Sequence, residues 1–216
     1  MSDRRCARVD RRAIRTRNNL ARAVIRLGQE RGVDRLTVGE LSRVAGVSRS
    51  AFYAHYGSLE DYLSRSFAAM LENLAANAQH RAGREDRRLL QCELILDHVA
   101  AAPKYVAVIS RSRHRPRMLL AGEERLRRHV EARLLEQRPH LANAARCDIA
   151  RFVSGGFIAM LRHWMESGMA TPPEVFRSRF ESLTDRFELS FDRRPGVQLP
   201  VPDAAVRHSL AWGETP

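Results

Sequence analysis

Lysine, cysteine and aromatic residues are scarce in this sequence of 216 residues, in which the aromatics make up 6%. Lys104 is the only lysine, so arginine carries nearly all of the positive charge. The three cysteines, Cys6, Cys92 and Cys147, form no CxxC pair and are odd in number, which argues against a disulfide framework and against a zinc site. The eight histidines form no HxxxH or HExxH pattern, so we expect no metal and no other cofactor.

Long apolar runs are also absent. The longest, Val153–Leu161, is interrupted by Ser154, Gly155 and Gly156 and is much shorter than the roughly 20 residues that span a bilayer. The first residues lack the apolar segment of a secretory signal. We therefore expect a soluble, cytoplasmic protein with no membrane partner.

Sequence patterns typical of enzymes are missing as well. There is no GxSxG motif, no glycine-rich phosphate loop, and no pair of carboxylates beyond those that surface helices usually carry. We therefore expect no enzymatic activity.

Positive charge is abundant and lies mainly near the beginning of the chain. The formal net charge is +12, and residues 1–57 contain thirteen arginines against five acidic residues. About a quarter of the chain thus carries two thirds of the excess positive charge, which favours a local nucleic-acid-binding surface. Binding of this segment to a membrane surface is the weaker alternative, because its apolar stripe is needed to form a small core.

Hydrophobic periodicity is helical throughout, which predicts an all-α fold of about nine helices. The first helix is expected over residues 11–31, with Asp10 as N-cap and Gly32 as stop. Beyond the central region, helices are expected over about residues 87–101, from just after Pro103 to Ser110, over about residues 118–137 and 142–167, and from the capping box at residues 171–174 to about residue 191. We expect a DNA-binding domain at residues 10–57, a regulatory and dimerisation domain at residues 58–192, and a loose tail at residues 193–216.

The segment between Thr37 and Tyr56 has the pattern of a helix-turn-helix. Thr37 and Glu40 form a capping box for a short helix that ends near Ala45. Gly46 allows a tight turn, and Ser48 caps a second short helix that ends near His55. Ser58 then caps a long helix. The apolar residues expected to hold the two short helices together are Val38, Leu41, Ala45, Val47 and Phe52.

This stretch resembles the signature of the tetracycline-repressor (TetR) family of transcriptional regulators. Residues 36–56 read LTVGELSRVAGVSRSAFYAHY, and the family pattern is approximately LTvxxIAxxAGVSxGxLYxHFxxKxxL, after a helix that ends in ERG, here residues 30–32. The resemblance covers about residues 14–63 and implies three helices that bind DNA, followed by an all-helical domain. Phe52 and Tyr56 are interpreted as core residues.

The DNA-contacting residues are expected on the second short helix and at neighbouring helix ends. Small or polar side chains there allow close approach to DNA, and arginine can bond guanine or phosphate. The candidates are Thr37, Arg43, Ser48, Arg49, Ser50, Ala51, Tyr53, His55 and Ser58. Leu59 stands where the family usually carries a phosphate-binding lysine. We therefore hypothesise that an arginine of the first helix, such as Arg15 or Arg17, substitutes for it.

The second domain is expected to hold a dimer interface and an effector pocket. The resemblance implies that the last two helices pair with those of a second copy, and the candidate residues are Gly155, Gly156, Phe176, Phe180, Leu183 and Phe187. Candidates for lining a pocket for a small apolar or amphipathic effector are Leu96, Tyr105, Ile109, Met118, Phe152, Phe157, Met160 and Trp164. Plain core packing is the alternative for each of them. The arginines at positions 111, 113, 115 and 117 are interpreted as a solvated loop, with contact to DNA or an acidic ligand as the alternative.

The sequence thus predicts a homodimeric repressor that binds double-stranded DNA at a palindromic operator and is released by a small molecule. A transcriptional activator, or a regulator without a small-molecule ligand, is the alternative. No residue pattern in the sequence distinguishes a repressor from an activator, or shows whether a small-molecule ligand binds.

Overall fold

The computed structural model describes residues 2–83 and 85–192, and the side chains of residues 14–83 and 85–185. The chain divides into two compact units, Met1–Glu181 and Ser182–Pro216. The expected tail, residues 193–216, lies outside the described residues. Within them every element is helical, as the sequence predicts: α1 (Ser2–Arg31), the 3₁₀ helix η1 (Val33–Arg35), α2 (Val38–Ala45), α3 (Arg49–Tyr53), α4 (Leu59–Ala82), α5 (Glu93–Ala100), α6 (Pro103–Ser110), α7 (Arg115–Gln137), α8 (Asn143–Glu166) and α9 (Pro173–Asp192).

Two helix starts differ from the expected ones. Helix α1 begins at Ser2, so Asp10 lies inside the helix and is not its N-cap. No glycine or proline precedes Asp10, and the arginines and alanine there favour helix. Helix α5 begins at Glu93, several residues later than expected. The Oδ1 atom of Asp86 accepts a hydrogen bond from the backbone N–H of Arg88 at 2.8 Å, a local turn that competes with helix formation.

Helices α1 to α3, which we call the head, pack against one another through apolar side chains. The stripe of Leu20, Val24 and Leu27 on α1 is buried, as its spacing predicts. Phe52 of α3 is completely buried, and its ring lies 5.5 Å from Tyr56 and 5.8 Å from Tyr62, centroid to centroid. Phe52 and Tyr56 are therefore core residues, which confirms their interpretation from the sequence.

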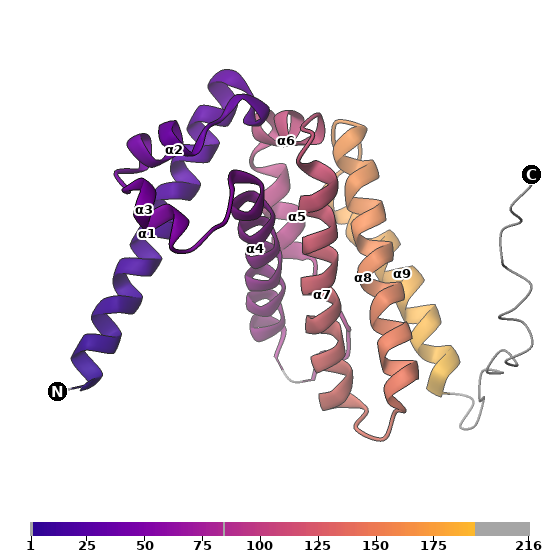
Figure 1. The fold of residues 1–216 in the computed structure, drawn as a ribbon. Helices are drawn as coiled ribbons and strands as arrows, with labels where there is room; N and C mark the ends of the chain where they lie inside the picture. Colours follow the sequence, from indigo (N-terminus) through magenta and orange to yellow (C-terminus); the bar gives the residue numbers. More distant parts are fainter. Residues whose placement is uncertain (1, 84, 193–216) are drawn as a thin grey trace, which may run out of the picture. The chain divides into compact units, whose positions relative to one another are not determined.

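The longer helices α4, α7 and α8 lie side by side (Figure 1). A glycine permits the close approach of α4 and α7. A side chain at Gly122 would place its Cβ 2.7 Å from Cδ1 of Leu71 and 2.9 Å from Cε1 of Phe67. Residues on α4 and α7 therefore share one tightly packed core, in which Leu71 and Leu126 are completely buried.

The first turns of α9 pack on α8 through aromatic side chains. The ring of Phe157 lies 5.9 Å from Phe176 and 5.3 Å from Phe180, and Trp164 lies 5.5 Å from Phe176. Phe176 and Phe180 are 4% and 3% exposed, so these two residues belong to the core of the single chain. Rings of α8 therefore cover Phe176 and Phe180, two of the dimer-interface candidates, within the chain.

Candidate nucleic-acid interface

The caps of the helix-turn-helix are formed as the sequence predicts. The Thr37 hydroxyl accepts a hydrogen bond from the Glu40 backbone N–H at 3.2 Å, and the Ser48 hydroxyl does the same for Ala51 at 3.1 Å. Gly46 ends α2 in the left-handed conformation with φ 65°, which glycine adopts without strain. These bonds fix where α2 ends and α3 begins, so the side chains of α3 have a defined direction.

Glu40 is held by more than its capping partner. Its carboxylate accepts hydrogen bonds from the Thr37 hydroxyl at 3.1 Å and from Nη1 of Arg31 at 2.7 Å. These bonds, that of Thr37 first, lower the pKa of Glu40. Arg31, the last residue of α1, is thus joined to the first turn of α2.

The candidates on α3 mostly lie on its exposed side. Arg49, Ser50 and Tyr53 are exposed, and Tyr53 retains 55% of its accessible surface. The hydroxyls of Ser48 and Ser50 lie 3.0 Å apart. The guanidinium of Arg49 lies over Gly39 of α2, where a Cβ would come within 2.5 Å of Nη2. This side of α3 therefore presents hydroxyls and one guanidinium together.

A shallow depression, which we call the basic notch, is lined by Arg17, His55 and Arg65. It has a volume of about 140 Å³ and is also lined by Thr16 and Tyr56. Arg65 was not among the residues predicted from the sequence. Nη1 of Arg65 donates to the carbonyl oxygen of His55 at 2.7 Å, and its guanidinium lies 5.0 Å from the centre of the Tyr56 ring. Arg65 also pairs with Asp61, four residues earlier, at 3.5 Å. This spacing of opposite charges is visible in the sequence and could have drawn attention to Arg65.

The remaining DNA-contact candidates lie apart from the notch. Arg43 is exposed on α2, and Ala51 is half-buried on α3. Ser58 is exposed, and its hydroxyl accepts from the Asp61 backbone N–H at 3.0 Å as the N-cap of α4. Leu59, at the position of the missing lysine, is half-buried.

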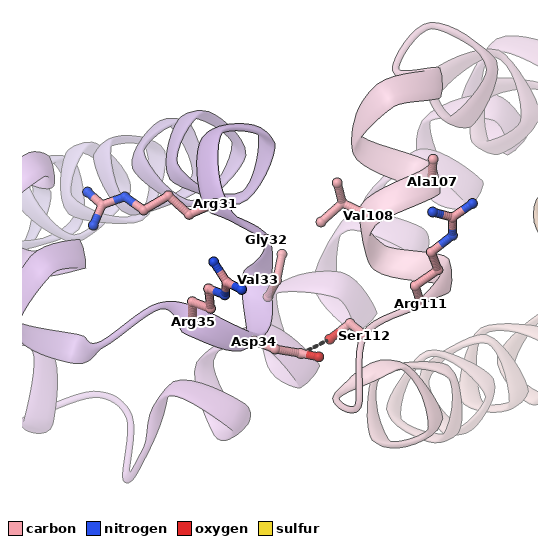
Figure 2. Close-up of a pocket in the computed structure, with 9 residues that line it drawn as sticks. All are labelled: Arg31, Gly32, Val33, Asp34, Arg35, Ala107, Val108, Arg111 and Ser112. Carbon is pink, nitrogen blue, oxygen red and sulfur yellow. Dashed lines mark hydrogen bonds between the residues drawn. The ribbon is translucent and has the colours of Figure 1, made fainter.

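Asp34 of η1 connects the head to the segment between α6 and α7. Its Oδ1 accepts a hydrogen bond from the Ser112 hydroxyl at 2.5 Å, shown in Figure 2, and its Oδ2 accepts from the Arg113 backbone N–H at 3.2 Å. His114 is buried beside this pair, with its ring nitrogens 4.0 Å from Asp34 and 3.8 Å from Glu60 of α4. We call Asp34, Ser112 and Arg113 the head clamp.

The arginines around position 113 are therefore more than a solvated loop. Arg113 binds Asp34, Arg115 pairs with Glu166 of α8 at 2.7 Å, and Arg117 lies 3.9 Å from Glu60. Arg111, Arg113 and Arg117 are exposed, as a solvated segment would be, but Arg115 and Arg117 belong to α7 and their acidic partners come from distant parts of the chain. Arg111 is exposed and lines a cavity of about 310 Å³ beside the clamp, together with residues of η1 (Figure 2).

The effector-pocket candidates occupy three different surroundings. Leu96, Ile109, Met118, Phe157 and Trp164 are buried. Met160 is half-buried, and Phe152 is 54% exposed. Tyr105 packs over Gly28 of α1, and burial raises its pKa to about 12. None of the eight lines the basic notch or the cavity beside the head clamp.

The dimer-interface candidates also lie in different surroundings. Gly155 is half-buried, whereas Gly156 and Leu183 are exposed. Phe176 and Phe180 lie in the core of the chain, as described above. The side chain of Phe187 lies outside the described residues.

None of the helices within residues 2–83 and 85–192 contains an apolar stretch of the length that spans a bilayer. No three histidine, cysteine or acidic side chains in those parts of the chain are grouped so that they could hold a metal ion.

The architecture is that of an all-helical regulator with a helix-turn-helix head, and comparisons with known proteins identify its family. Residues 20–63 match the model of "Bacterial regulatory proteins, tetR family", and residues 90–186 match a "Transcriptional regulator C-terminal region" of the TetR type. The chain belongs to the TetR family of DNA-binding transcriptional regulators.

A curated relative is the uncharacterized HTH-type transcriptional regulator YxbF of Bacillus subtilis (strain 168). It is 26% identical over 184 residues, which cover 82% of this chain and 46% of the relative. This chain thus spans about half the length of that relative.

Solved structures share the fold at low sequence identity. The dihydroxyacetone kinase operon activator DhaS has a TM-score of 0.56 and 16% identity, over 78% of this chain and 93% of that one. The TetR transcriptional regulator from Streptococcus agalactiae 2603V has a TM-score of 0.52 and 22% identity, over 82% and 98%. The fatty acid degradation regulator FadR from Bacillus halodurans has a TM-score of 0.53 and 13% identity, over 77% and 96%.

Proposed function

We propose that this regulator binds a palindromic operator as a homodimer in the cytoplasm and represses transcription until a small-molecule effector releases it. The observation that carries the proposal is the exposed side of α3, where the side chains of Arg49, Ser50 and Tyr53 are accessible. Side-chain caps at the starts of α2 and α3 hold this helix in place. In this proposal residues 10–57 form the DNA-binding domain and residues 58–192 the regulatory and dimerisation domain.

In the proposed complex α3 enters the major groove. Arg49 bonds guanine or phosphate, while Tyr53 and His55 bond phosphate oxygens. The helix starts at Thr37 and Ser58 add backbone N–H groups for the same phosphates. Arg17 reaches the backbone from the basic notch, in place of the lysine that Leu59 replaces.

Dimerisation follows from the symmetry of such an operator, because two-fold half-sites are matched by a two-fold protein. Exposed apolar surface supports it: Phe152 is 54% exposed and Leu183 is 58% exposed. Among the described residues, no atom from outside this helix lies within 4 Å of a Cβ placed at Gly156, which leaves room for a partner helix to approach closely.

Release requires that effector binding change the position of the heads. The head clamp supports this coupling, since Asp34 of η1 bonds two residues of the α6–α7 segment. An effector that binds more tightly to the arrangement unable to hold DNA would shift the population towards it.

A shift assay tests the proposal, with DNA flanking the protein's own coding region and salt as the variable. We expect binding to a palindrome, with affinity that falls steeply as salt rises. Failure to bind any palindrome there would contradict it. A reporter gene under that operator separates the alternatives, since removal of a repressor raises expression and removal of an activator lowers it.

Sedimentation of the Gly156→Arg variant tests the dimer. We expect the wild-type chain to sediment as a dimer and the variant as a folded monomer. Gly57→Arg is the control, because Gly57 lies near the head and a side chain there enters open space. Gly168→Arg would not serve, because its φ of 71° would strain any side chain.

A further inference from the structure

A cavity of about 490 Å³ lies between the last turns of α4 and the last turns of α7. Its polar lining comes from Gln79 and His80 on α4 and from His129, Arg133 and Glu136 on α7. Ala76 and Ala132 line it as well. A volume of this size is typical of sites for small organic molecules.

Arg133 is the most unusual residue of this cavity, because it is a charged side chain with only 7% of its surface exposed. Its Nη2 donates to the carbonyl oxygen of Asp86. Its Nη1 lies 3.9 Å from Oε2 of Glu136, which is too far for a hydrogen bond. The buried Nε atom has no hydrogen-bond partner among the described residues.

The charge of Arg133 is therefore poorly compensated. Burying a guanidinium is unfavourable unless an anion and a full set of acceptors accompany it. Glu136, the nearest carboxylate, is 69% exposed and remains largely solvated. A bound anion would supply the acceptors that the protein does not provide.

The histidines make the same cavity suitable for a polar ligand. The Nε2 atom of His129 is buried and has no hydrogen-bond partner within the described part of the chain. Burial lowers the pKa of His129 and the charge of Arg133 lowers it further, although Glu72 and Glu136 act in the opposite sense. His80 is exposed at the rim. The cavity thus offers one buried positive charge, with polar side chains and the largely solvated carboxylate of Glu136 around it.

We propose that this cavity binds a small organic anion, with its carboxylate or phosphate group held by Arg133 and its polar remainder contacted by His129 and His80. Guanidinium binds both kinds of oxyanion through paired hydrogen bonds. The site is distinct from the apolar pocket expected around Phe157 and Trp164, because neither residue lines it. Binding at this site does not depend on the proposed function, but its role as an effector site does.

Calorimetric titration of the full chain with citrate and, separately, with inorganic phosphate tests the proposal. Sodium chloride at matched ionic strength controls for screening. We expect one of the two anions to bind, which also identifies the head group. Arg133→Met should weaken binding at least about tenfold, the value of a charged hydrogen bond. Arg128→Met is the matched control, since Arg128 lies on the same helix, is 61% exposed and does not line the cavity.

Because Arg133 is buried, its variant could fail to fold, and two further variants keep the test decisive. His80→Ala removes an exposed rim residue, and Ala132→Leu fills the cavity from an exposed position. Both should weaken binding while the melting temperature stays within a few degrees of wild type. The proposal is overturned if neither anion binds beyond chloride, or if these variants bind as tightly as wild type. A shift assay without added anion reports on DNA binding separately, so the two failures are distinguishable.

Discussion

The hydroxyl of Ser112 donates a hydrogen bond of 2.5 Å to the carboxylate of Asp34, although 78 residues separate them in the chain. Ser112 is buried, and the second carboxylate oxygen accepts from the backbone N–H of Arg113 at 3.2 Å. Partial burial by itself would raise the pKa of Asp34, but the bonds from Ser112 and Arg113 outweigh it and lower the pKa. The head is thus tied to the α6–α7 segment by an ionised carboxylate.

A double-mutant cycle measures this tie. We expect Asp34→Asn and Ser112→Ala each to lower the free energy of unfolding by about 1 kcal/mol, a value reduced for the partial exposure of Asp34. The double variant should lose less than the sum, since both changes remove the same bond. Urea unfolding of the four proteins gives the coupling energy. If the losses in unfolding free energy of the two single variants simply add in the double variant, the contact contributes nothing.

The same carboxylate predicts a dependence on pH. The pKa of Asp34 is lower in the folded than in the unfolded chain, so its contribution is fully present above the unfolded value of about 3.9. The contribution disappears as pH falls through the lowered, folded value. The difference in unfolding free energy between wild type and Asp34→Asn should therefore be constant from pH 5 to 8 and shrink below about pH 4. A difference that grows on acidification would contradict the assignment.

Two glycines in helices should respond oppositely to alanine. Gly122→Ala places a methyl group against Leu71 and Phe67 and should lower the free energy of unfolding by about 1–3 kcal/mol. In the single chain, no described atom outside the helix's own backbone lies within 4 Å of a Cβ at Gly156, so Gly156→Ala should raise the free energy of unfolding by about 0.5–1 kcal/mol at chain concentrations that keep the protein monomeric. Denaturant midpoints at a single protein concentration give both values. Equal effects at the two sites would refute the close packing of α4 and α7.

The basic notch predicts a salt effect. If Arg17 binds a phosphate, Arg17→Ala should weaken operator binding and reduce the slope of log affinity against log salt by about 1. Arg26→Ala is the control, since Arg26 lies on the same helix, is 73% exposed, pairs with Glu30 and does not line the notch. An unchanged slope for Arg17→Ala would remove this residue from the interface.

The exposed side of α3 predicts loss of specific binding without loss of fold. Combining Arg49→Ala with Tyr53→Phe should lower operator affinity by at least about tenfold, because one good base contact contributes about 1–3 kcal/mol and the phosphate contact of Tyr53 is lost as well. Both side chains are exposed, so circular dichroism and melting temperature should stay unchanged. Retained specific binding by a folded variant would place recognition elsewhere on the head.

The local elements of the head were predictable because their signals are local. Thr37, Ser48 and Ser58 cap the helices that their neighbours predict, and Gly46 forms the turn between α2 and α3. Each of these interactions joins residues at most a few positions apart, so the sequence states them directly. The buried Phe52 was predictable for the same reason, from spacing along one short helix.

Contacts between distant segments could not be predicted in the same way. The sequence determined an all-helical chain, the position of the helix-turn-helix and the concentration of arginine near it, because composition, caps and periodicity are local properties. Only the tertiary structure decided that Ser112 bonds Asp34, that Phe176 and Phe180 face Phe157, and that Arg133 is buried beside a cavity. Many pairings of an arginine or a phenylalanine satisfy the same pattern, and the packing of the helices selects one of them.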